Sequence, residues 1–250
     1  MHLPSNLLSR ATCLALALSW AGVGYGQLGA EDPNFTQKNH AIVTGAHAHS
    51  FGLGFDLHYR RKYADRVDLL FEWALSSYRD PSETRVPSLY SSQGGRDYVL
   101  DKQNQVYFLG MTAGAQYTLI QRTEFSRVQV SGGLGVGPIW AIRKPYLLEV
   151  IRGNTLVVEP YQGPEVQSFE SIFGQGEFLR RFDLISTQWG ARVRGNLTVD
   201  LSGTSFFVRA LHLGFQGDFF PSPVPILFSG ANRSSFWGVY AGFVVGTAWE

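Results

Sequence analysis

The residues of this sequence best suited to chemistry are two histidines and a serine in the stretch GAHAHS, at His47, His49 and Ser50. A serine becomes a nucleophile when a neighbouring histidine takes its proton, and a carboxylate commonly orients that histidine. Alternate histidines on a strand also share one face, as two ligands of one metal ion must. No third ligand or carboxylate stands at a diagnostic spacing. We therefore keep a lipid-modifying enzyme that uses these three residues as an alternative, and we predict no metal site.

A second polar set alternates with apolar residues in FGLGFDLHYR, residues 51–60. Successive side chains of a strand point to opposite faces, so this stretch has one apolar face and one polar face. Charged side chains that share a narrow interior must be paired or hydrated, because an unpaired buried charge is costly. We predict a lumen charge network of cross-lumen ion pairs that closes the interior, made of Asp56, His58, Arg60, Asp68, Glu72, Arg192 and Arg194.

Eight strand-like segments must position these residues. They cover about residues 40–50, 51–60, 65–78, 104–119, 127–140, 185–200, 205–216 and 235–249, and no long amphipathic helix pattern interrupts them. An even number of strands suits a closed antiparallel barrel. The alternation leaves open which face of 205–216 points inward.

The connections between these segments differ in length. Residues 61–64, 121–126 and 201–204 make short connections, whereas 79–103 and 141–184 make long ones. Outer-membrane barrels have short periplasmic turns and long extracellular loops, and their apolar stripes end in aromatic girdles. The predicted fold class is therefore all-β, an antiparallel transmembrane β-barrel of about eight strands with long extracellular loops, over residues 39–250.

The two long connections differ in composition. Residues 79–103 are polar and turn-rich, which is typical of a solvated loop. Residues 141–184 carry apolar patterning, aromatic residues and paired arginines, and ordered loops of this length are usually functional. We expect this segment to bind a protein partner through Arg143, Lys144, Tyr146, Glu149, Phe173, Phe178, Arg180 and Arg181.

The N-terminal residues indicate export. Residues 1–26 combine Arg10, an apolar run and small residues, which predicts a secretory signal peptide, and 27–38 predict a short periplasmic lead. The one cysteine, Cys13, lies inside the signal, so the exported chain has no disulfide and no thiolate chemistry. Without Arg10, 20 basic residues balance 20 acidic ones, which argues against a nucleic-acid partner.

Several stretches also carry a family resemblance, among them GLGFDLHYRRK, LLFEWALSSYRDPSE, VSGGLGVGPIWAIRKPYLLEV and SIFGQGEFLRRF. In their order along the chain, the sequence resembles small outer-membrane β-barrel proteins of the Gram-negative Bacteroidota. The resemblance implies an outer-membrane location in contact with lipid, and a role as the barrel subunit of a larger assembly or secretion complex. It supplies no catalytic residue and no cofactor.

The sequence thus predicts a non-enzymatic integral outer-membrane barrel with a charge-plugged lumen, no cofactor, and a structural or partner-binding role. A soluble lipocalin-like binding barrel is a second alternative. It requires the opposite sidedness, with Leu53, Phe55 and Leu57 enclosing a dry cavity.

Overall fold

The computed structural model describes residues 39–121, 128–163, 165–178, 180–202, 207–230 and 232–249. The predicted signal peptide at 1–26 and the periplasmic lead at 27–38 lie outside these residues. In the described part of the chain, no helix is long and apolar enough to cross a membrane.

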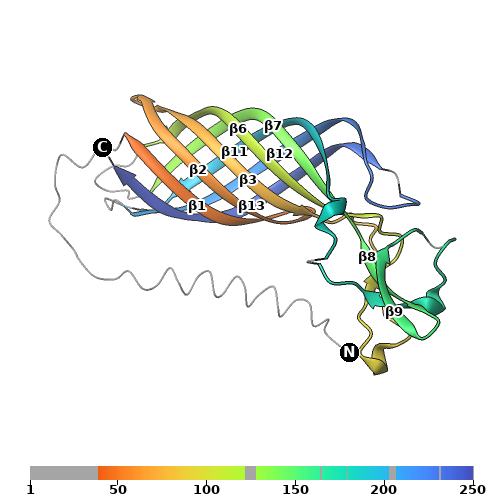
Figure 1. Ribbon diagram of the computed structural model, residues 1–250. Helices are drawn as coiled ribbons and strands as arrows, with labels where there is room; N and C mark the ends of the chain where they lie inside the picture. The colour runs from red at the N-terminus through yellow and green to blue at the C-terminus, as the bar shows by residue number, and fades with distance from the viewer. Residues whose placement is uncertain are drawn as a thin grey trace. The chain divides into compact units, whose positions relative to one another are not determined.

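Eight strands close into an antiparallel barrel in the order β1-β13-β12-β11-β7-β6-β3-β2 (Figure 1). Closure follows from β1, which pairs with β2 on one side and with β13 on the other. The strands are β1 (His40–His49), β2 (Gly52–Ala64), β3 (Val67–Tyr78), β6 (Asn104–Ile120), β7 (Gln129–Pro145), β11 (Ser186–Asp200), β12 (Phe207–Val224) and β13 (Arg233–Trp249). The predicted all-β antiparallel barrel is confirmed, and each of the eight predicted segments overlaps one of these strands.

The barrel has a short-turn end and a long-loop end. At the short-turn end, Asp65 and Arg66 alone join β2 to β3. At the long-loop end, residues 79–103 join β3 to β6, 146–185 join β7 to β11, and 225–232 join β12 to β13. The predicted asymmetry holds except at Ser50 and Phe51, a tight turn on the long-loop side.

A smaller sheet lies beyond the long-loop end, where Figure 1 labels β8 and β9. In it, β8 (Leu147–Arg152) pairs with β10 (Ile172–Gln175) on one side and β9 (Thr155–Pro160) on the other. The other elements of the loops are β4 (Arg85–Val86), β5 (Tyr98–Val99) and the 3-10 turns η1 (Ser91–Gln93), η2 (Phe169–Ser171) and η3 (Phe182–Leu184).

The prediction of a solvated loop at 79–103 holds for most of the segment and is wrong for Tyr98 and Val99, which pack into the core of the smaller sheet. Tyr98 and Val99 are buried, and the Val99 amide donates a 2.8 Å hydrogen bond to the Tyr146 hydroxyl. This core consists of Tyr98, Val99, Tyr146, Leu148, Val150, Tyr161 and Ile172. An apolar pair within a polar run has no periodicity, so the sequence pattern carries no signal for it.

The outer face of the barrel is apolar on every strand. Large apolar side chains that are more than one third exposed include Ile42, Phe55, Trp73, Leu119, Val136, Trp189, Leu213 and Val239. Leu53, Phe55 and Leu57 point outward and are 69%, 54% and 39% exposed. The lipocalin-like alternative is therefore wrong, since it requires these three side chains to enclose a cavity.

The sequence leaves open which face of β12 points inward. In the structure its large apolar side chains point outward, as on the other strands. Leu211 and Leu213 are exposed on the outer face, whereas Ala210 and His212 are buried on the inner face. Arg209 shares the parity of the two leucines and so belongs to the outward row.

Candidate functional site

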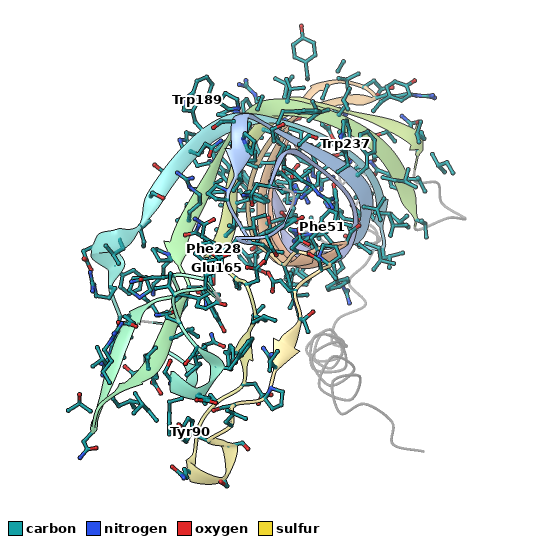
Figure 2. All side chains as sticks on the ribbon, turned by 90° about the vertical axis from the view of Figure 1, so that its right-hand side faces the viewer. Phe51, Tyr90, Glu165, Trp189, Phe228 and Trp237 are labelled. Carbon is teal, nitrogen blue, oxygen red and sulfur yellow. The ribbon has the colours of Figure 1, made fainter. Side chains whose placement is uncertain are left out.

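The interior of the barrel is occupied by side chains in three layers, and the layer at the long-loop end is apolar. We call this layer the apolar plug; it consists of Tyr78, Val106, Phe108, Ile139, Ala141, Phe220, Val224, Ile226, Leu227 and Phe236. The Phe108 ring lies 5.5 Å from that of Phe220 and 5.2 Å from that of Phe236, between centroids. Phe51 packs against the plug, and Figure 2 shows it at the mouth of the ring of strands.

At the short-turn end a second apolar cluster lines the side of the interior formed by β1, β12 and β13. It contains Val43, Val208, Ala210 and Val244, all of them at most 4% exposed. The predicted charge-plugged lumen is thus corrected in part: paired charges occupy the middle of the interior, and the apolar plug closes the long-loop end. At the short-turn end, buried Asp200 lies beside Ala210 of the second cluster, so that end is both polar and apolar.

The middle layer is a set of buried ion pairs, which we call the central charge layer: Asp56, Glu72, Arg192, Arg194 and Asp218. Arg194 Nη1 and Nη2 donate to the two Asp56 carboxylate oxygens at 2.8 and 3.1 Å, and Nη1 also contacts Glu72. Arg192 Nε and Nη2 donate to Asp218 at 2.6 and 2.9 Å. All five residues are at most 3% exposed. Bidentate pairing of this kind is what makes buried charges tolerable.

Histidine and tyrosine rings surround the central charge layer. His47 Nδ1 lies 2.7 Å from Asp56 Oδ2, and the His58 nitrogens lie 3.9 Å from Asp56 and 3.7 Å from Glu72. The Arg194 guanidinium lies 4.1 Å above the Tyr240 ring. These contacts join β1, β2, β3, β11 and β13 across the lumen, so the layer ties together strands far apart in the sequence.

Inward-facing glycines make room for these large side chains. A Cβ at Gly110 would lie 2.5 Å from Arg192 Nη1, and one at Gly54 would overlap the His47 imidazole. A side chain at either position would therefore have to displace the neighbouring Arg192 or His47.

The structure brings five of the seven predicted lumen residues together: Asp56, His58, Glu72, Arg192 and Arg194. Arg60 and Asp68 share the inward parity but lie nearer the short-turn end, where both are only partly buried.

Sequence reasoning missed Asp218, His47 and His212 as lumen residues. Asp218 was missed because β12 continues past the predicted end at 216. The inward parity of His212, Gln216 and Asp218 was the signal that could have found it. The GAHAHS pattern indicates His47 only as a catalytic residue or a metal ligand, although it shares a face of β1 with buried Val43.

The residues of the enzyme alternative do not assemble. His47 approaches Asp56, but both are buried in the lumen, whereas the Ser50 hydroxyl donates to the Val239 carbonyl and accepts from the Val239 amide. His49 Nδ1 accepts from the Phe51 amide. No contact among the described residues joins Ser50 to either imidazole, so this site lacks the nucleophile and base pair that acyl transfer requires.

Asp56, His58 and Glu72 place ligand-type atoms within 4.8 Å of one another. Arg194 contacts both carboxylates of this group, so a guanidinium already supplies the positive charge there. The arrangement fits an ion-pair network better than a metal centre.

The predicted partner-binding loop divides into buried and exposed residues. Tyr146 and Lys144 are 1% and 2% exposed, and the candidate surface is corrected to exclude them. Arg143 is partly buried, Glu149 pairs with Arg96 at 2.9 Å, and Phe173 stacks on Tyr90. Phe178, Arg180 and Arg181 are exposed and remain candidates.

No protein-family model matches this sequence, and no curated protein matches it. Solved structures with a similar fold include Neisserial surface protein A, at 9% identity and TM-score 0.40, with 84% of this chain and 95% of that chain covered. Ail of Yersinia pestis, in complex with the heparin analogue sucrose octasulfate, follows at 11% identity, TM-score 0.39, and 84% and 97% coverage. OprG of Pseudomonas aeruginosa has 11% identity, TM-score 0.36, and 86% and 96% coverage.

Proposed function

We propose that this chain is a non-enzymatic, integral outer-membrane barrel that binds a protein partner at its long-loop end, as a subunit of an assembly or secretion complex. The observation that carries the membrane location is the outer face of the barrel. Exposed apolar side chains lie on every strand around the barrel, whereas soluble monomers rarely expose apolar patches larger than a few hundred Å². Such an outer face suits contact with outer-membrane lipid, which we propose as the surroundings of the barrel.

The filled interior supports a binding role over a transport role. The apolar plug covers the central charge layer at the long-loop end, and about eight strands leave room only for the side chains themselves. An interior of this kind stabilises the barrel, which supports the proposal that binding occurs at the loops.

The candidate partner surface consists of Phe178, Arg180, Arg181 and Phe182, beside η3. The Lys144 ammonium lies 4.3 and 4.4 Å from the centroids of the two phenylalanine rings, while Phe178 and Phe182 remain 45% and 50% exposed. Exposed aromatic residues next to arginines are enriched among the residues that dominate protein interfaces.

The experiment has two steps. First, fractionation of cells should recover the protein with the outer membrane, resistant to carbonate extraction; recovery in the soluble fraction would contradict the membrane location. Second, tagged protein extracted in mild detergent should retain companions in stoichiometric amounts.

The variant Phe178→Ala with Arg180→Ala and Arg181→Ala should lose those companions. Arg152→Ala is the matched control, because Arg152 is also exposed and ion-paired on the same side of the barrel. Companions that survive the triple substitution would contradict this surface, and a monomer without companions would contradict the partner-binding role.

A further inference from the structure

The two edges of the smaller sheet are protected very differently. The β10 edge is covered by residues of the 79–103 connection, since the Ser88 hydroxyl donates to the Phe173 carbonyl at 2.6 Å and Tyr90 donates to the Glu170 carbonyl at 2.7 Å. Among the described strands, β9 pairs only with β8, which leaves its other edge unpaired. An uncovered edge strand is a template on which another strand can pair.

Backbone geometry shows which groups of β9 are free. The Tyr161 amide donates to the Tyr146 carbonyl at 2.8 Å, in register with the β8 and β9 ladder. Because backbone groups alternate along a strand, Thr155, Val157 and Glu159 point their N–H and C=O toward β8. Leu156 and Val158 therefore point theirs to the open edge, and within the described chain no hydrogen bond to these groups is found. Pro160, which has no N–H to leave unpaired, ends this edge.

The side chains at this edge suit pairing as well. Leu156 is 51% exposed on one face of the sheet and Val157 is 38% exposed on the other. The segment TLVVEP carries no lysine, and its ladder with β8 runs without a bulge. The devices that usually block edge pairing are therefore missing from β9 between Thr155 and Val158.

We propose that β9 pairs with β9 of a second copy of this chain, antiparallel and about a two-fold axis at Val157. In this register Leu156 of one copy lies opposite Val158 of the other, and their outward backbone groups form four hydrogen bonds. Val157 lies opposite Val157, and Thr155 lies opposite Glu159. Apolar residues thus face apolar residues and polar residues face polar ones, so the strand is complementary to itself.

The self-complementary register is the reason for a second copy rather than another protein. A single added strand buries less surface than the roughly 1,200–2,000 Å² of a stable soluble complex. The strength of the pairing, though not its geometry, therefore rests on the proposed membrane location, which keeps two copies at high effective concentration.

Cysteine cross-linking tests this register directly, because Cys13 is the only cysteine in the sequence and lies in the predicted signal peptide. Val157 would face its own copy as a pair without hydrogen bonds, at about 4.5 Å between Cα atoms, which a disulfide can span. We expect Val157→Cys to form a disulfide-linked dimer in isolated membranes under mild oxidation. Thr155→Cys, on the same strand but opposite Glu159, is the matched control and should give at least tenfold less dimer.

A second pair of substitutions tests whether the edge itself is used. Leu156→Lys with Val158→Lys adds charge without changing the backbone, and it should abolish the dimer of Val157→Cys. The inference is overturned if membrane-inserted Val157→Cys stays monomeric, if Thr155→Cys links equally well, or if the disulfide joins a different protein. Failure of membrane insertion would be seen earlier, in the fractionation, and would contradict the proposed function instead.

Discussion

Two arginine–carboxylate pairs in this protein have similar geometry and opposite surroundings. Arg194 pairs with Asp56 in the lumen, where both side chains are at most 2% exposed. Arg152 pairs with Glu159 on the smaller sheet through donors at 2.9 and 3.2 Å, with its own side chain 59% exposed. Water can replace Glu159 as the partner of Arg152, but it cannot easily reach Arg194. The same chemical pair is therefore a structural requirement in one place and nearly optional in the other.

The largest effect is expected for Arg194→Met, which leaves Asp56 and Glu72 buried without their cation. Breaking a buried pair on one side costs about 3–5 kcal/mol, so the free energy of unfolding should fall by that amount. Urea unfolding of the detergent-solubilised barrel, followed by the gel-mobility shift between folded and unfolded forms, measures it.

Adding Asp56→Asn and Glu72→Gln to Arg194→Met should recover most of this loss, because no charge is then left unpaired. If the free energy of unfolding of Arg194→Met falls by less than about 1 kcal/mol, water must reach the lumen and solvate the unpaired carboxylates, as it does for the exposed pair.

The next largest loss of stability is expected when the space around Arg192 is filled. Gly110→Ala would push a methyl group against Arg192 Nη1 and displace it from Asp218, and overpacking of this kind costs about 1–3 kcal/mol. Gly132→Ala is the matched control on the neighbouring strand, because its Cβ would meet only Leu119 at an ordinary 3.6 Å. Equal urea midpoints for the two variants would show that the Arg192 pair adjusts freely.

A small effect is expected for Arg152→Ala. The pair it removes is exposed, so the free energy of unfolding should change by less than about 1 kcal/mol in the same urea assay. A loss as large as that of Arg194→Met would remove the contrast between the two pairs.

The smallest effect is a pH dependence at Glu159. Burial raises the pKa of this carboxyl, but hydrogen bonds from Arg152 and Gln167 outweigh it and hold the pKa below its ordinary value. The pair therefore stabilises the smaller sheet above the unfolded pKa, and this contribution is lost as the pH falls through the folded pKa. An NMR titration of the Glu159 carboxyl carbon should show the lowered pKa, and Arg152→Ala should raise it; an unchanged value would contradict the role of Arg152.

Alternation of apolar and polar residues predicted most of the barrel, including the inward placement of Asp56, Glu72, Arg192 and Arg194. Alternation is a local property of extended chain, so it can be recognised in one sequence without knowing which strands are neighbours. It could not predict the partner of each charge, because Arg194 and Asp56 are 138 residues apart and meet only when the barrel closes.

The loops were harder to predict for the same reason. Lys144 and Tyr146 look exposed in a long charged connection, yet Tyr146 is buried because Tyr98 and Val99 come from a different connection to cover it.

By itself, the sequence determined the strand order along the chain, the apolar outer face and the polar character of the lumen, since all three follow from side-chain period and connection length. Only the tertiary structure decided that an apolar plug closes the long-loop end of the lumen, that Asp218 completes the central charge layer, and that the β9 edge stays open. Each of these three features depends on whether segments far apart in the sequence come into contact. A local sequence pattern carries no information about such contacts.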